Sequence, residues 1–259
     1  MVTGASPRGD GVFVVAEMGS NHDGDLAQAL RLVSVGAEAG VDAVKAQAIP
    51  PFQRDWLEPL FDACEVHGVE FMITPFDVKA VRILDPYVRR WKIASAEITR
   101  DDLLTAALRT GKPMILSTGM ATTDEIRYAL QFCGSHRPVG VLQPTLLHCV
   151  SAYPAPYELM NLRAMNHLVW GNYTPGISDH TLGWHVALAA VALGARVVEK
   201  HFTLDRALSG PDHHYALEPG ELMTMVSQIR DVEKALGKRS REPYPQEVLE
   251  ARGRNLVWT

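Results

Sequence analysis

Short runs of β-branched and other apolar residues alternate along the chain with longer segments that have helical hydrophobic spacing. Runs of this length and composition are typical of buried strands. We expect strands at residues 12–19, 42–47, 71–76, 90–95, 113–119, 145–151, 173–179 and 195–203. In the segment 25–40, which follows the first run, Leu26, Leu30, Val33 and Ala37 share a helical face. Further helices are expected at 122–132, 184–195 and 219–237, the last two ending near a glycine.

Eight strand–helix units in 259 residues favour a single α/β domain, a (β/α)8 TIM barrel over residues 12–237. A doubly wound open sheet is the alternative. It would normally carry a GxGxxG turn after the first strand, and "AEMGSNHDGD" does not match that pattern. We expect a flexible N-terminal segment over 1–11 and a charged, proline-containing tail over 238–259.

The composition narrows the class of protein. With 47% hydrophobic residues the chain can bury a large core, and a net charge of −5 argues against a nucleic-acid surface. The chain shows neither the apolar segment of a signal peptide nor a run long enough to span a membrane. Cys64, Cys133 and Cys149 form no CxxC pair, which fits buried free thiols in a reducing compartment. We therefore expect a cytoplasmic protein without nucleic-acid or membrane partners.

Polar residues end every expected strand, where the active site of a barrel enzyme lies. They are Glu17, Lys45, Gln47, Thr74, Lys92, Ser95, Glu97, Ser117, Thr118, His148, Ser151, Ser178, Asp179, His180, Glu199, Lys200 and His201. A charge inside a barrel mouth is costly unless it is paired or used. The two lysines Lys45 and Lys92, with hydroxyls from the neighbouring strand ends, would form a pocket for a small anion that carries a phosphate and a carboxylate.

The stretch "EKHFTLDRALSGPDHH" follows the last strand and contains three histidines. His201 and His180 end adjacent strands, so their imidazoles could bind one divalent metal such as Mn²⁺, Fe²⁺, Co²⁺ or Zn²⁺. The alternative is a pair of histidines that are hydrogen-bonded across a loop. His213 and His214 lie in the loop beyond, where a solvated or substrate-facing role is expected.

Eight motifs resemble the sialic acid synthase (N-acetylneuraminate synthase) family in order and spacing. They are "AEMGSNHDGD", "VKAQ", "TPFD", "KIASAE", "KPMILSTGMAT", "LLHCVSAYPAP", "GISDHT" and "EKHFTLDRALSGPDH" followed by "LEP", and they extend over residues 12–236. Members of this family condense phosphoenolpyruvate with an amino sugar such as N-acetylmannosamine. The resemblance implies a metal-dependent, aldol-type condensation that gives a 2-keto-3-deoxy acid and phosphate.

The resemblance also implies roles for individual residues. His180 and His201 would hold the metal, most often Mn²⁺ with Mg²⁺, Co²⁺, Fe²⁺ or Zn²⁺ as alternatives, and Glu17 and Glu97 would join them at the reaction centre. The residues implied to bind phosphoenolpyruvate are Lys45, Lys92, Ser95, Ser117, Ser151 and Ser178. Those implied to contact the acceptor are Gln47, Tyr153 and Asp212.

Two departures from the family concern the acceptor. The segment between the second and third strands leaves room for little more than one helix, and the printed chain stops at "RGRNLVWT", near the point where an antifreeze-like domain would begin. The acceptor is then an N-acetylmannosamine-like sugar or a related aldehyde. We expect a homo-oligomer or a separate polypeptide that supplies the domain in trans. We also predict that His213 or His214 helps to fill the acceptor side.

Two other functions stay open at this point. A metal-dependent sugar isomerase or epimerase could use the same histidines, but it would leave Lys45 and Lys92 without a task. A non-catalytic ligand-binding barrel would be expected to have lost some of these energetically costly polar residues.

Overall fold

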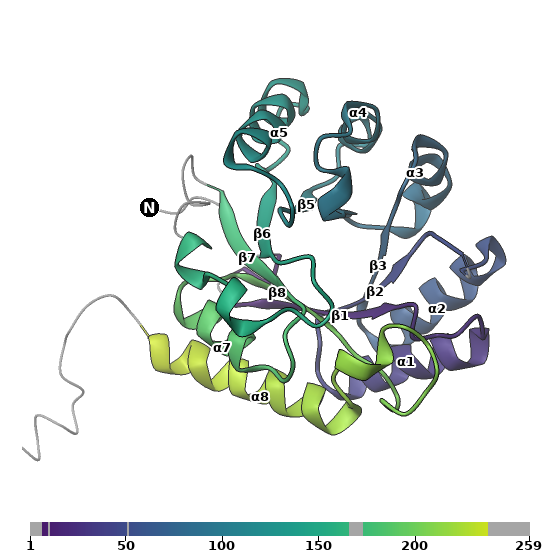
Figure 1. Cartoon of the computed structure of the whole chain (residues 1–259). Coiled ribbons are helices and arrows are strands. Elements are labelled where there is room, and N and C mark those ends of the chain that lie inside the picture. Colours follow the sequence, from purple (N-terminus) through teal and green to yellow (C-terminus); the bar gives the residue numbers. More distant parts are fainter. Residues whose placement is uncertain (1–6, 10, 51, 166–172, 238–259) are drawn as a thin grey trace, which may run out of the picture.

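Eight parallel strands form the centre of the molecule, and helices lie around them (Figure 1). The computed structural model describes residues 7–9, 11–50, 52–165 and 173–237. The strands are β1 (Phe13–Gly19), β2 (Ala43–Gln47), β3 (Glu70–Thr74), β4 (Trp91–Ile93), β5 (Met114–Ser117), β6 (Thr145–Cys149), β7 (Thr174–Asp179) and β8 (Val197–His201). Each overlaps one predicted run, and β4 is the shortest because the chain turns into a 3-10 helix two residues after it.

The strand order is β3-β2-β1-β8-β7-β6-β5-β4, and all neighbouring strands in this order pair in parallel. The first strand therefore pairs with the last, as closure of a barrel requires. β3 and β4, at the two ends of this order, contact each other, so the barrel is nearly closed. The predicted (β/α)8 barrel is confirmed, and the doubly wound sheet is excluded.

The helices connect consecutive strands around the outside of the barrel (Figure 1). They are α1 (Leu26–Glu38), α2 (Leu57–His67), α3 (Val78–Leu84), α4 (Asp101–Arg109), α5 (Thr123–His136), α7 (His185–Ala192) and α8 (Pro219–Leu236). Between β2 and β3 the chain forms α2 after one short 3-10 turn, which agrees with the predicted room for one helix. Helix α5 begins as predicted, because Thr122 and Glu125 form a reciprocal capping box.

Helix α1 packs against the main core with the four residues that were predicted to share a face. Val33 is fully buried, and Leu26, Leu30 and Ala37 are half-buried and pack against the core. The other fully buried residues of the helix are Ala29, Leu32 and Gly36. A Cβ atom on Gly36 would lie 2.7 Å from Cγ2 of Val44, so the helix approaches β2 closely at this position.

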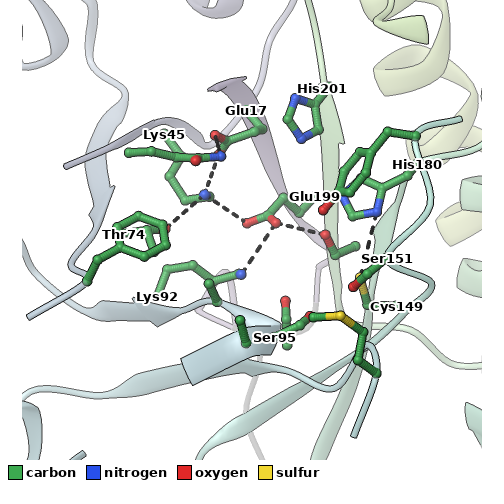
Figure 2. Close-up of a pocket in the computed structure, with 18 residues that line it drawn as sticks. Glu17, Lys45, Thr74, Lys92, Ser95, Cys149, Ser151, His180, Glu199 and His201 are labelled. Carbon is green, nitrogen blue, oxygen red and sulfur yellow. Dashed lines mark hydrogen bonds and ion pairs between the residues drawn. The ribbon is translucent and has the colours of Figure 1, made fainter. Parts of the chain in front are cut away.

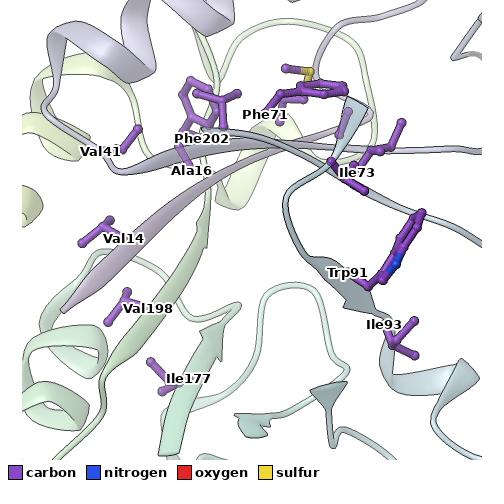
Figure 3. Close-up of a cluster of buried hydrophobic side chains, with 14 of the residues drawn as sticks. Val14, Ala16, Val41, Phe71, Ile73, Trp91, Ile93, Ile177, Val198 and Phe202 are labelled. Carbon is purple, nitrogen blue, oxygen red and sulfur yellow. The ribbon is translucent and has the colours of Figure 1, made fainter. Parts of the chain in front are cut away.

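Apolar side chains cover both faces of the barrel wall. On the outer face, Val14, Ile73, Ile93, Ile177 and Val198 belong to the main core, which packs between strands and helices (Figure 3). On the inner face a second cluster fills the barrel, formed by Phe13, Val15, Ala43, Met72, Ile115, Leu147 and Val197. Successive strand residues point to opposite faces, so this inner cluster defines which positions of each strand face the barrel interior.

Several predictions concern the rest of the chain. The three cysteines are free and buried, as predicted. Residues 1–6 and 10 of the expected flexible segment, and the expected tail 238–259, lie outside the described residues. Within the described residues no helix is long and apolar enough to cross a membrane.

Candidate active site

A polar layer lies directly beyond the apolar interior, at the C-terminal ends of the strands. On six strands, the residue two positions after a member of the inner cluster also faces the barrel interior, and this residue is polar. These positions are Glu17 on β1, Lys45 on β2, Thr74 on β3, Ser117 on β5, Cys149 on β6 and Glu199 on β8. Side chains alternate between the two faces of a strand, so the inward-facing position that follows the apolar interior is the one at the mouth of the barrel, where an active site lies.

These side chains line a cavity of about 310 Å³ at the mouth of the barrel (Figure 2). Eleven of the predicted site residues line it, namely Glu17, Lys45, Gln47, Lys92, Ser95, Ser117, Ser151, Tyr153, Ser178, His180 and His201. Thr74, Phe76, Met120, Cys149 and Glu199 also contribute to its wall. The volume suits a small ligand rather than a macromolecular segment.

Two lysines and two glutamates form one buried cluster at the bottom of this cavity (Figure 2). The Lys45 ammonium contacts the Glu17 carboxylate, lies 3.7 Å from Oε2 of Glu199 and donates to Oγ1 of Thr74 at 3.0 Å. Nζ of Lys92 lies 3.5 Å from Oε1 of Glu199. Glu199 is one of the predicted strand-end residues, but no role was predicted for it. The available signal was its position two residues before His201, which puts both on one face of β8.

The pKa values in this cluster follow from burial and from the neighbouring charges. Burial lowers the pKa of Lys45, but the charges of Glu17 and Glu199 outweigh it, so the net shift is upward. Burial also lowers the pKa of Lys92, and Glu199 offsets this only in part. For Glu199, burial raises the pKa, but the two lysines together hold it well below its ordinary value. The pKa of Glu17 is raised by burial and by the nearby Glu199.

Hydroxyl groups converge around Gly119, just after β5. A Cβ atom on this glycine would lie 2.4 Å from Oγ of Ser151 and 2.9 Å from Oγ of Ser95, so only glycine leaves this space open. The Gly119 N–H donates to Oγ of Ser95 at 3.0 Å. The Ser117 hydroxyl is buried and has no hydrogen-bond partner in the part of the chain that the structure describes. This unpaired hydroxyl lines the same cavity as two lysines, and an anionic ligand there would give it a hydrogen-bond partner.

His180 and His201 face each other across the cavity mouth, with ring centroids 5.4 Å apart. Nδ1 of His180 lies 2.9 Å from the carbonyl oxygen of Val150. Because a carbonyl can only accept, this nitrogen carries the hydrogen, and Nε2 keeps its lone pair. Burial lowers the pKa of His201 to about 4, so its ring is neutral near pH 7. The two rings therefore meet the chemical requirements of a shared divalent metal.

The protein supplies few other metal donors. Within the described ranges, no group of three or more His, Cys, Asp or Glu side chains is arranged to hold an ion. The pair of histidines would thus leave the remaining coordination positions to water and substrate, as an open catalytic site does.

The predicted acceptor residues lie at a second cavity of about 630 Å³, next to the first. Gln47, Tyr153 and His201 line both cavities. Asp212 lines the second one, where its Oδ2 accepts from the Ser20 N–H at 3.1 Å and from the Ser20 hydroxyl at 2.8 Å. Burial raises the pKa of Tyr153 to about 12, so its hydroxyl remains protonated and can donate.

Three predicted residues are placed elsewhere. Glu97 does not line the first cavity, because it ends the 3-10 turn Ser95–Glu97 and pairs with Arg100 at 2.9 Å. The prediction that His213 or His214 fills the acceptor side is wrong, since neither lines the second cavity. His213 is fully buried, lies 3.0 Å from both carboxylate oxygens of Asp23 and 2.6 Å from Oγ1 of Thr203, whereas His214 is exposed.

Other strand-end candidates face away from the cavities. Lys200 and Asp179 form a buried ion pair at 3.0 Å on the outer face of β7 and β8. His148 likewise points outward, with Nε2 2.6 Å from the carbonyl oxygen of Met160. In each case the neighbouring residue on the strand faces the barrel, and the alternation of side chains turns these residues toward the helices.

Comparisons with known proteins show which family this chain resembles. Residues 49–241 match the NeuB family. An N,N'-diacetyllegionaminic acid synthase of Campylobacter jejuni is 39% identical over 87% of this chain and 77% of the relative. An N-acetylneuraminate-9-phosphate synthase of Homo sapiens is 31% identical over 95% of this chain and 77% of the relative.

Solved structures show the same similarity in three dimensions. The crystal structure of an N-acetylneuraminic acid synthetase from Leptospira borgpetersenii, in complex with citrate, superposes with a TM-score of 0.88 at 35% identity, covering 96% of this chain and 93% of that one. A truncated 3-deoxy-D-arabino-heptulosonate 7-phosphate synthase from Thermotoga maritima has a TM-score of 0.76 at 17% identity, and this likeness concerns the fold alone.

Proposed function

The chain belongs to the NeuB family and condenses phosphoenolpyruvate with a sugar to form a keto-deoxy acid, and we propose that the smaller cavity is where phosphoenolpyruvate binds and reacts. One observation carries this assignment: two buried lysines and a group of strand-end hydroxyls meet in a cavity that fits a small anion. Membership of this family removes the case for an isomerase or for a non-catalytic barrel.

Lys92 and Ser117 are the groups best placed to receive the anion. Lys92 is buried, and its carboxylate partner Glu199 lies at 3.5 Å rather than at close hydrogen-bond distance. The Ser117 hydroxyl has an unused donor. A phosphate or carboxylate oxygen between them would gain charge-assisted hydrogen bonds without breaking an existing strong one. Ser95 and Ser151, next to Gly119, would supply further donors.

We further propose that His180 and His201 hold a divalent metal, with Mn²⁺ as the first candidate. The charges of the buried cluster support this, because two lysines and two glutamates cancel. A highly charged anion would therefore enter a cavity that has no net positive charge of its own. When bound, the metal would polarise the carbonyl group of the acceptor as a Lewis acid.

Side chains of this protein would assist the remaining steps of the reaction. Phosphoenolpyruvate C3 forms the new bond to the carbonyl carbon of the acceptor, whose oxygen takes up a proton. Water then adds at C2, and phosphate leaves. We propose that Glu17 moves a proton in this sequence, because its carboxyl group lines the cavity and contacts the Lys45 ammonium. Its Oε1 is held by the Gly19 N–H at 2.9 Å and by the Gln47 amide at 3.1 Å.

The function is tested by measuring phosphate and keto-acid release from phosphoenolpyruvate with candidate sugars, in the presence of Mn²⁺. We expect equal amounts of the two products, and only when both substrates are present. A folded, metal-loaded protein that releases no phosphate with any acceptor would contradict the proposal. Conversion of a sugar in the absence of phosphoenolpyruvate would favour an isomerase.

The metal site has its own test, which does not depend on turnover. Equilibrium dialysis with Mn²⁺ should show one bound ion in the wild type and loss of binding in His180→Ala and His201→Ala. His185→Ala is the matched control, because His185 lies at the start of α7 and does not line the cavity. Unchanged Mn²⁺ binding in the two site variants would refute the assignment.

A further inference from the structure

A buried ion pair lies directly beside the two candidate metal ligands in the chain. Asp179, the last residue of β7, precedes His180, and Lys200 precedes His201 on β8. Nζ of Lys200 lies 3.0 Å from Oδ2 of Asp179, and the exposed fractions of the two side chains are 1% and 0%. Both histidines line the first cavity, whereas neither member of the ion pair does. The proposed chemistry therefore gives this buried pair no role.

The pairing of β7 with β8 ends at these two residues. Asp179 lies opposite Lys200 in the parallel register, and each histidine comes one residue later. His201 is still paired with Glu17 of β1, whereas His180 lies beyond the end of β7. The position of His180 relative to His201 therefore depends on the side-chain contacts that hold the chain just after β7.

Asp179 and Lys200 supply such contacts on both sides of His180. Oδ1 of Asp179 accepts hydrogen bonds from the Thr181 N–H at 2.9 Å and from the Thr181 hydroxyl at 2.8 Å, which forms a turn with His180 at its centre. The Lys200 ammonium donates to the Asp179 carboxylate and to the Thr181 carbonyl oxygen. One cation on β8 thus holds the residue before His180 and the residue after it.

Other contacts orient the His180 ring and backbone toward the neighbouring loop. Nδ1 of His180 donates to the carbonyl oxygen of Val150 at 2.9 Å, and the His180 carbonyl accepts from the Ala155 N–H at 2.9 Å. Both partners belong to the segment that follows β6. These bonds fix His180 relative to β6, and the contacts of Lys200 fix the same turn relative to β8, which carries His201.

We propose that Asp179 and Lys200 are positioning residues, which set the position of His180 relative to His201 and thereby the affinity of the site for a divalent metal. The inference rests on the proposed metal site. Packed apolar residues can often replace a buried ion pair without loss of stability. An apolar side chain at position 200 could not donate to Asp179 and Thr181 together, so the charged pair has a use here that apolar packing lacks.

The test measures Mn²⁺ binding to the double variant Asp179→Asn, Lys200→Met by equilibrium dialysis. Removal of both charges leaves neither of them buried alone, so we expect this variant to fold. Mn²⁺ should bind about 10–100-fold more weakly than to the wild type, as is common when the groups that hold metal ligands are changed. The electron paramagnetic resonance spectrum of the bound Mn²⁺ should also change, because the two rings are no longer held at one spacing.

Thr181→Val is a milder second variant, which keeps the shape of the side chain and removes one hydrogen bond to Asp179. It should weaken Mn²⁺ binding by roughly twofold to fivefold.

Glu70→Gln, Arg90→Met is the matched control. Arg90 donates to the two carboxylate oxygens of Glu70 at 2.6 and 2.9 Å, and this pair lies at the start of β3 and just before β4, at the opposite end of the strands from the histidines. The control should keep the Mn²⁺ affinity and the spectrum of the wild type, even where its denaturation midpoint is lower. A purely structural role for Asp179 and Lys200 would give the double variant this same behaviour.

Wild-type Mn²⁺ affinity in the double variant, or in Thr181→Val if the double variant does not fold, would overturn the inference and leave the proposed metal site standing. An equal loss of affinity in the control would also overturn it, because general destabilisation would then explain the effect. A wild type that binds no Mn²⁺ would overturn the metal site together with the inference. Phosphate release from phosphoenolpyruvate tests the proposed function separately.

Discussion

Two buried clusters of lysine and carboxylate lie on opposite faces of the same barrel wall. The inner cluster joins Lys45 and Lys92 to Glu17 and Glu199 inside the barrel, and the outer pair joins Lys200 to Asp179 under the helices. Glu199 and Lys200 are consecutive residues, and both are buried. The clusters thus share strands, burial and chemistry, and differ in the face of the strand that carries them.

The two clusters differ in how completely their charged groups are paired by ion pairs and hydrogen bonds. Lys200 donates to Asp179 and to the Thr181 carbonyl, and the second oxygen of Asp179 accepts from the Thr181 N–H and hydroxyl at 2.9 and 2.8 Å. In the inner cluster Lys92 has its carboxylate partner at 3.5 Å, and an open cavity adjoins it. A saturated buried pair holds the fold together, whereas an incompletely paired cluster beside a cavity is available to a ligand.

The largest effect is expected from Lys200→Met. It would leave the Asp179 charge buried without a cation, and the free energy of unfolding should fall by about 3–5 kcal/mol. Urea denaturation measures this. The double variant Asp179→Asn, Lys200→Met should recover most of the loss, because no unpaired charge remains. A single variant as stable as the wild type would show that the outer pair is not structural.

Lys92→Met should reduce activity strongly and stability little, in contrast to Lys200→Met. The kcat/KM for phosphoenolpyruvate should fall by roughly 10²–10³-fold, since a charged donor to the reacting anion is lost. Stability should change little, because Glu199 keeps Lys45 and accepts from Ser178 at 2.8 Å. Steady-state kinetics and thermal denaturation together test this. Preserved kinetics with a large loss of stability would remove the distinction between the two clusters.

Phosphoenolpyruvate binding should depend on pH through Lys92. Burial lowers the pKa of Lys92 in the free protein, and a bound anion would raise it again. Binding therefore takes up a proton at a pH above the lowered pKa, and affinity falls as the pH rises, by at most about tenfold per pH unit for one proton. Calorimetry in buffers of different ionisation enthalpy counts this proton. If the Lys92→Met variant still takes up a proton when phosphoenolpyruvate binds, another group is responsible for the pH dependence.

The smallest expected effects on stability and binding distinguish Ser117 from Ser178, two serines that line the same cavity. Ser117→Ala should leave the free energy of unfolding unchanged, because the hydroxyl has no partner within the described residues, yet weaken phosphoenolpyruvate binding by roughly fivefold. Ser178→Ala should lower stability by about 1 kcal/mol, since Glu199 loses a donor. Denaturation curves and titrations of both variants measure these differences. Identical stability losses would contradict the assigned roles.

Much of the site could be predicted because a barrel brings all strand ends to one edge. Eleven of the predicted residues line the first cavity, although they come from strands far apart in the chain. Glu97, His213 and His214 could not be placed this way, because they lie beyond the strands, in turns whose geometry depends on partners such as Arg100 and Asp23. The close approach of α1 to β2 also depends on a neighbour, since Gly36 packs against Val44.

The sequence by itself determined the eight strands, their parallel closure and the edge at which the chemistry gathers. Only the tertiary structure decided which of two adjacent charged residues faces the cavity and which forms an ion pair under the helices. The reason is physical: a barrel strand is buried on both faces, so apolar residues occur without alternation. In Val197–His201 the first two residues are both apolar and buried, so the hydrophobic pattern of the run does not indicate that Glu199 faces inward and Lys200 outward. The pairing of β8 with β1 and β7 fixes which of these two side chains faces the barrel interior.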